Sequence, residues 1–135
     1  MRSNKFRLGG LIGPAKLSPK INFPVYYGAD KEIVLIDPAT PFPDEQENLR
    51  VQINHLLENG AQVAAVLLTH SHPDHIGAAE MVRKEYGAPI WAHEATDERV
   101  DFEIDRYLKN NEVLNIPGDP DWRLKCLHTP GHDPG

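Results

Sequence analysis

Short apolar runs recur along the chain, separated by polar stretches that are rich in proline and glycine. Three of these runs are almost continuous, which is typical of strands buried on both faces of a sheet. They cover residues 33–36, 63–68 and 89–93. Residues 44–59 place leucine and isoleucine at helical spacing behind an acidic first turn, which predicts an amphipathic helix between the first two strands. Residues 77–86, which end before Gly87, predict a second helix between the second and third strands.

The remaining third of the chain predicts strands joined by turns. Residues 106–109 and 112–116 flank an Asn-Asn pair, and asparagine tolerates the left-handed backbone conformation of tight turns. We therefore expect these two segments to pair as a hairpin around Asn110 and Asn111. Residues 123–129 predict a last strand. The order of the elements indicates helices layered on a β-sheet.

The composition narrows the class of protein. Of the 135 residues, 40% are hydrophobic and 25% are charged, which fits a folded globular domain rather than a disordered chain. The net charge of -6 argues against broad electrostatic binding to nucleic acid or anionic lipid. No stretch predicts a transmembrane helix, and residues 1–20 lack the apolar core of a secretory signal. Together with the single cysteine, Cys126, this leads us to expect a cytoplasmic protein that does not bind membranes.

A cluster of titratable residues directly follows the second expected strand. His70, His72 and Asp74 are two residues apart, so in an extended segment their side chains point to the same side. A turn at Pro73 would bring His75 back beside them. Imidazole nitrogen and carboxylate oxygen suit zinc, and also iron or manganese. Chance clustering on the surface is the alternative, but protonated imidazoles without a bound cation would repel one another.

Three segments resemble one known family. Residues 69–77, THSHPDHIG, resemble the His-x-His-x-Asp-His signature of the metallo-β-lactamase superfamily. Residues 33–38, IVLIDP, resemble the strand and aspartate that precede this signature, and residues 127–132, LHTPGH, resemble the segment that carries the next metal-binding histidine. The resemblance makes residues 21–135 a partial metallo-β-lactamase domain, and residues 1–20 an irregular lead-in.

The resemblance implies an α+β fold, the N-terminal half of an αββα sandwich with a mixed β-sheet and flanking helices. Later strands of the family supply a bridging aspartate and a final histidine, whereas this sequence ends at Gly135 without them. We therefore expect a fragment, a truncated gene product or one piece of a larger assembly. Its sheet edge and apolar face would need the missing C-terminal half or an oligomeric partner to cover them.

The resemblance also implies a metal centre. His70, His72 and His132 would form a first metal site, and Asp74 and His75 would contribute to a second. Two zinc ions are expected per full domain, with iron or manganese as alternatives. A metal-bound water or hydroxide would be the nucleophile, and Asp74 would be the catalytic residue that orients this water or takes its proton.

Other candidate residues have less specific roles. Asp37 is either a hydrogen-bonding partner behind the ligand loop or a residue that forms the turn before Pro38. His93 and His128 follow or lie in expected strands, where structural roles are favoured. Cys126 is expected to be a small residue of the core.

The function implied by the resemblance is that of a metal-dependent hydrolase of the glyoxalase II-like and β-lactamase-like-protein-2-like branch. The bond cleaved would be an ester, a thioester or a phosphodiester, so the substrate is a small molecule or single-stranded RNA. A truncated, non-catalytic metal-binding or interaction module is the alternative of a different class. An oxidative enzyme that uses iron at the same ligands, such as a persulfide dioxygenase, is a third.

Overall fold

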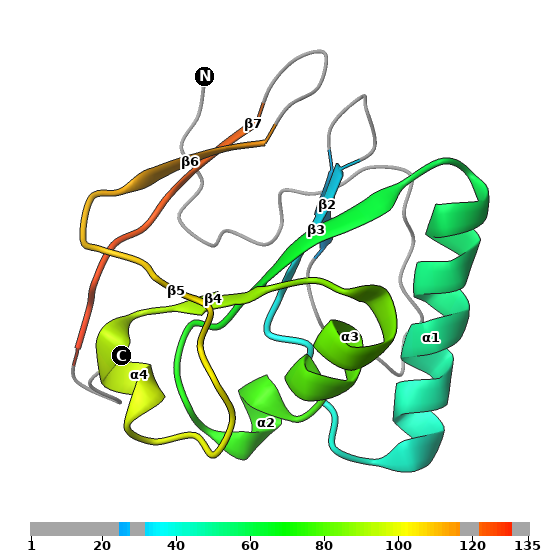
Figure 1. The fold of residues 1–135 in the computed structure, drawn as a ribbon, viewed down its shortest axis with the longest axis horizontal. Helices are drawn as coiled ribbons and strands as arrows, with labels where there is room; N and C mark the ends of the chain where they lie inside the picture. Colours follow the sequence, from blue (N-terminus) through cyan, green and yellow to red (C-terminus); the bar gives the residue numbers. More distant parts are fainter. Residues whose placement is uncertain (1–24, 28–31, 117–121, 131–135) are drawn as a thin grey trace.

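The computed structural model describes residues 25–27, 32–116 and 122–130. The described residues form an α+β fold with two sheets, one of five strands in the order β1-β2-β3-β4-β5 and one of two strands, β6 and β7 (Figure 1). The first sheet consists of β1 (Val25–Tyr27), β2 (Glu32–Ile36), β3 (Gln62–Leu67), β4 (Ile90–Ala92) and β5 (Arg106–Tyr107). The second consists of β6 (Val113–Ile116) and β7 (Trp122–Lys125). The first sheet is mixed, because β1 is antiparallel to β2 whereas β2 to β5 run parallel.

Two of the helices were predicted from the sequence. They are α1 (Pro43–Glu58) and α3 (Ala79–Tyr86), and the structure adds two single-turn helices, α2 (Pro73–Ile76) and α4 (Glu94–Asp97). α1 buries Leu49 and Ile53, as its apolar spacing predicts. α3 ends at Gly87, whose φ of 71° is in the left-handed region that glycine adopts without strain.

β2 is buried on both faces because its side chains alternate between two cores. Ile33 and Leu35 belong to the core beneath α1 and α3. Val34 and Ile36 belong to the core that the first sheet shares with β6 and β7. Figure 1 shows the resulting layers, with α1 and α3 on one side of β2 and β3, and the β6–β7 pair on the other. This three-layer arrangement explains why the strand sequences are continuous apolar runs.

The hairpin expected around Asn110 and Asn111 is wrong. β5 pairs in parallel with β4, and β6 pairs antiparallel with β7 in the other sheet. The turn itself exists, with Asn111 at φ 69°, but it carries the chain from one sheet to the other. Leu108 before the turn and Leu114 after it are both buried in the core between the sheets. The chain therefore buries both leucines although β5 and β6 do not pair with each other.

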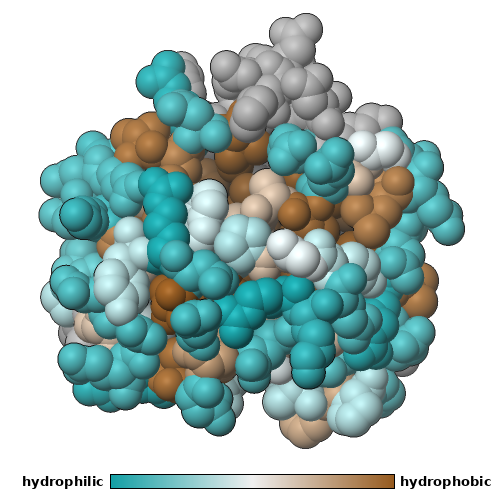
Figure 2. Space-filling view, in the orientation of Figure 1, coloured by the Kyte–Doolittle hydropathy of each residue, from teal (hydrophilic) through white to brown (hydrophobic). Residues whose placement is uncertain are grey.

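The outward face of β6 and β7 is largely polar. Cross-strand pairs on it join Val113 to Lys125 and Asn115 to Arg123, so three of these four side chains are polar. On the face seen in Figure 2, separate apolar areas are surrounded by polar residues. No helix among the described residues has both the length and the apolar character needed to cross a bilayer.

Candidate metal centre

Two segments of the chain meet at the edge of the first sheet where β2 and β3 end. The two strands run parallel, with Ile36 opposite Leu67, so their carboxyl ends lie side by side. Asp37 follows β2, and its backbone N–H donates to the carbonyl oxygen of Leu67 at 2.9 Å. The loop that follows β3 carries the histidine cluster. Parallel pairing therefore places Asp37 beside that cluster, at the edge where sheets of this kind hold their ligands.

The imidazole ring of His70 packs against those of His72 and His75. The ring centroids of His70 and His75 are 4.0 Å apart, and those of His70 and His72 are 4.8 Å apart. All three side chains are partly exposed. The cluster is therefore accessible from solvent and is not sealed inside the core.

The extended segment on which the two-residue spacing depends ends at His72, whose backbone is extended at φ -69° and ψ 143°. Pro73 occupies the first position of α2, where proline is favoured because the N–H that it lacks would have no partner within the helix. His72 is the N-cap of α2, and its carbonyl oxygen accepts from the N–H of His75 at 2.8 Å. Asp74 lies in the helix. The expected turn at Pro73 is thus helical, and it brings His75 back to His70.

The Asp37 carboxylate binds the histidine loop at three points. Oδ1 accepts from the backbone N–H of Thr69 at 2.8 Å. Oδ2 accepts from the Thr69 hydroxyl at 2.5 Å and lies 2.9 Å from Nδ1 of His75. Burial raises the pKa of Asp37, and the hydrogen bonds from Thr69 and His75 oppose this shift. Because Asp37 also has a φ of 53°, it turns the chain before Pro38, so both of its expected roles are present.

The chemistry of these side chains fits a divalent metal ion. One ligand atom each from Asp37, His70 and His75 can be chosen so that all three lie within 4.8 Å of one another, and such donors suit zinc. Asp37 already accepts three hydrogen bonds, so we assign it to orienting the loop and not to the metal itself. The side chain of Asp74 and all of His132 lie outside the described residues, so the predicted ligand set stays a prediction.

Gln46 and Gly77 hold the ligand loop against the segment that follows β2. The Gln46 amide donates to the carbonyl oxygens of Thr40 at 3.0 Å and Gly77 at 3.2 Å. A β-carbon on Gly77 would lie 2.5 Å from the carbonyl oxygen of Ala39, so only glycine fits without a shift of backbone. Neither residue was predicted from the sequence to have a role. Gly77 is the last residue of the histidine motif at residues 69–77, but nothing in the pattern distinguishes Gln46 from other polar residues of its helix.

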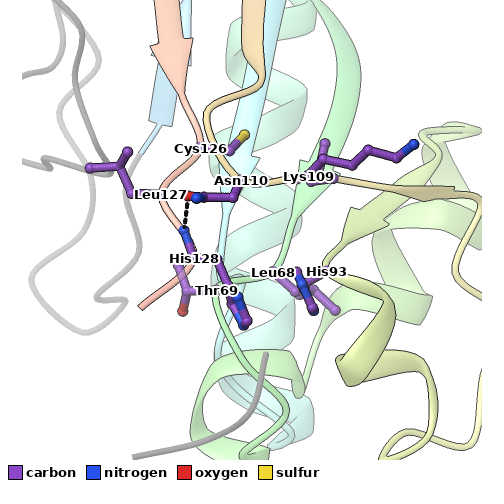
Figure 3. Close-up of a pocket in the computed structure, with 9 residues that line it drawn as sticks. Leu68, Thr69, His93, Lys109, Asn110, Cys126, Leu127 and His128 are labelled. Carbon is purple, nitrogen blue, oxygen red and sulfur yellow. Dashed lines mark hydrogen bonds between the residues drawn. The ribbon is translucent and has the colours of Figure 1, made fainter. Parts of the chain in front are cut away.

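A small pocket lies beside Thr69, near the ends of β3, β4 and β7 (Figure 3). His93 and His128 stack in it, with ring centroids 3.9 Å apart and ring planes at 11°. Nδ1 of His93 accepts from the N–H of Ala95 at 3.0 Å, and Oδ1 of Asn110 accepts from the N–H of His128 at 2.9 Å. Burial, and then the neighbouring imidazole, lower the pKa of His93. The stack joins the end of β4 to the segment after β7.

The layered fold and the histidine loop at its strand ends define the class of protein. The family model of the Metallo-beta-lactamase superfamily matches residues 21–135, and the chain belongs to this superfamily. The resemblance carried by the three sequence motifs is therefore confirmed. The α+β fold, as part of a metallo-β-lactamase sandwich, is confirmed as well.

Individual relatives agree with this assignment. Hydroxyacylglutathione hydrolase GloC of Haemophilus influenzae is 30% identical, over 84% of this chain and 58% of the relative. The crystal structure of BLEG-1 B3 metallo-beta-lactamase superposes with a TM-score of 0.62 at 30% identity, over 88% of this chain and 61% of that one. A metallo-beta-lactamase of Cronobacter sakazakii superposes with a TM-score of 0.70 at 19% identity, over 85% of this chain and 50% of that one. At this identity the similarity supports the fold alone. The chain thus spans only part of the length of each.

Proposed function

We propose that the protein is a metal-dependent hydrolase whose metal centre is built on the loop after β3. The observation that supports this most is the packing of His70 and His75, with ring centroids 4.0 Å apart, beside a buried carboxylate that binds the same loop. His70, His72 and His132 would hold one metal ion. Asp74 and His75 would contribute to a second.

Zinc is the metal that we propose, with iron and manganese as alternatives for the same donor atoms. When bound, a divalent ion lowers the pKa of a water molecule and polarises the carbonyl or phosphoryl oxygen of a substrate. The residues of the chain have separate tasks beside it. Asp74 is proposed to orient the attacking water or to take its proton. Asp37 holds the ligand loop through Thr69 and His75.

Glutathione thioesters are the substrate class that we propose. The support is that GloC, which is similar over most of this chain, is named a hydroxyacylglutathione hydrolase. Phosphodiesters of single-stranded RNA, considered from the sequence, are the second class to test. We propose a cytoplasmic location for this activity, where glutathione is abundant.

Metal content tests the ligand assignment. We expect His72→Ala to lower the zinc content of the purified protein markedly, because it removes one of three imidazoles from the first site. His55→Ala is the matched control, because His55 is an exposed histidine on α1. The measurement is zinc per chain by mass spectrometry after dialysis. Wild-type zinc content in His72→Ala would falsify the assignment of His72.

Turnover tests the reaction. The zinc-loaded full-length protein is incubated with a hydroxyacylglutathione thioester, with a β-lactam and with a short single-stranded RNA, and we expect hydrolysis of the thioester. If the protein hydrolysed only the RNA, the proposed substrate class would change from glutathione thioesters to phosphodiesters of single-stranded RNA. Zinc binding without turnover of any of the three would overturn the hydrolase proposal in favour of a non-catalytic metal-binding module.

A further inference from the structure

The hydroxyl group of Thr69 lies between a carboxylate and an imidazole. Its Oγ1 is 2.5 Å from Oδ2 of Asp37 and 3.0 Å from Nδ1 of His70. A hydroxyl group has one hydrogen to donate, and a carboxylate can only accept. The hydrogen of Thr69 therefore points to Asp37. Because that hydrogen is used, Oγ1 must accept from His70, so the proton of the His70 imidazole is on Nδ1.

The same carboxylate oxygen fixes the tautomer of a second histidine. Nδ1 of His75 lies 2.9 Å from Oδ2 of Asp37, so it also donates and carries the ring proton. A neutral imidazole with its proton on Nδ1 has its lone pair on Nε2, which is the atom that can then bind a metal ion. Asp37 thus acts directly on His75, and it acts on His70 through the Thr69 hydroxyl.

We propose that Thr69 is a positioning residue that passes the influence of Asp37 to His70 and keeps Nε2 of His70 as the metal-binding atom. This inference rests on the proposed metal-dependent function. Thr69 binds Asp37 through its backbone N–H at 2.8 Å as well as through its hydroxyl, so the relay starts from a residue that is itself held in place. Loss of such an outer hydrogen bond typically lowers metal affinity about 10- to 100-fold.

Thr69→Val tests the relay, because valine keeps the branched shape and lacks the hydroxyl. In ¹H–¹⁵N spectra of the metal-free protein that correlate the imidazole nitrogens with the ring protons, we expect His70 to carry its proton on Nδ1 in the wild type and in Thr69→Ser. In Thr69→Val we expect a shift of the proton towards Nε2. Zinc affinity, measured by competition with a chelator, should fall about 10- to 100-fold in Thr69→Val and less in Thr69→Ser.

Thr96→Val is the matched control, because it removes a buried threonine hydroxyl that lies outside this network. It should leave the His70 tautomer and the zinc affinity unchanged. An Nε2-protonated His70 in the wild type would overturn the relay without any variant, and so would an unchanged tautomer in folded Thr69→Val. If the tautomers behave as expected but the wild type binds no zinc, the relay holds and the proposed function fails.

Discussion

At Gly77, two loops of the candidate metal centre approach each other closely. A β-carbon there would lie 2.5 Å from the carbonyl oxygen of Ala39 and 2.5 Å from the backbone nitrogen of Pro41. Both neighbours are backbone atoms, so they cannot rotate away as the end of a side chain can. Gln46 donates to the carbonyl oxygen of Gly77 at 3.2 Å, which holds the same close contact together. Substitution of this glycine must therefore move the ligand loop.

We expect Gly77→Ala to lower the free energy of unfolding by about 1–3 kcal/mol, as overpacking of a tight contact does. We also expect weaker zinc binding, because the shift displaces the loop that carries the histidines. Urea denaturation and chelator competition measure the two effects. Gly87→Ala is the control. An added β-carbon on Gly87 would contact no other residue within 4 Å beyond its chain neighbours, so at φ 71° the substitution costs about 1 kcal/mol through backbone strain alone. Equal zinc affinity in both variants would contradict the coupling of this contact to the metal centre.

Among the helices and strands, those whose own apolar residues mark the face that packs into a core could be predicted from local sequence patterns. α1 was predicted from its apolar spacing, and β2 and β3 from continuous apolar runs. The hairpin at Asn110 and Asn111 was wrong because a turn can be recognised locally, whereas the partners of β5 and β6 are set by strands far away in the sequence. The role of Thr69 was missed for the same reason, since Asp37 is 32 residues away.

Asp105, the residue before β5, binds both β4 and the helix α3. Its Oδ2 accepts from the N–H of Ile90 at 2.8 Å, at the start of β4, and from Nη1 of Arg83 on α3 at 3.0 Å. These bonds, that from Ile90 above all, hold the pKa of Asp105 below its ordinary value of 3.8. β4 has only three residues and β5 has two, so bonds from side chains matter more here than in a long strand.

We expect Asp105→Ala to lower the free energy of unfolding at pH 7 by about 1 kcal/mol, the usual net contribution of one hydrogen bond. The folded state lowers this pKa, so the contribution is fully present above pH 3.8 and is lost as the pH falls through the folded value. Denaturation at pH 7 and at pH 3 should therefore show the gap between wild type and variant narrowing in acid. Asp101→Ala, at an exposed position in the same connection, should leave stability unchanged at both pH values. If the difference in the free energy of unfolding between wild type and Asp105→Ala were larger at pH 3 than at pH 7, the ionised Asp105 carboxylate would not be the source of the stabilisation.

At the scale of the whole molecule, the core between the two sheets holds the second sheet to the first. Leu114 and Leu124 of the second sheet pack there against Val34 and Leu67 of the first. Cys126 belongs to the same core and is 6% exposed, which confirms its expected role. Burial raises the pKa of its thiol to about 11. The thiol therefore reports whether the two sheets are together.

We expect Cys126 to react very slowly with iodoacetamide at pH 8 while the sheets stay packed. A rise in pKa from 9.0 to about 11 alone lowers the reactive thiolate fraction about 100-fold, and burial slows access further. Because the chain has a single cysteine, mass spectrometry of the whole protein gives the rate directly. In increasing urea the rate should rise together with the loss of circular dichroism. Rapid labelling of protein with a native spectrum would show that the second sheet separates by itself.

The geometry of Asp37 restricts which mutations this position tolerates. A left-handed backbone at φ 53° is adopted readily by glycine, asparagine and aspartate and is avoided by longer or branched side chains. Glycine would keep the turn but remove the acceptor, and asparagine would keep the turn but present an amide with only one acceptor atom to three donors. Glutamate would keep the negative charge, but its longer side chain disfavours the left-handed backbone conformation that this position requires. Of the twenty amino acids, only aspartate combines a tolerated left-handed backbone with a carboxylate that can accept all three hydrogen bonds. Every amino-acid substitution at position 37 is therefore expected to weaken the attachment of the histidine loop.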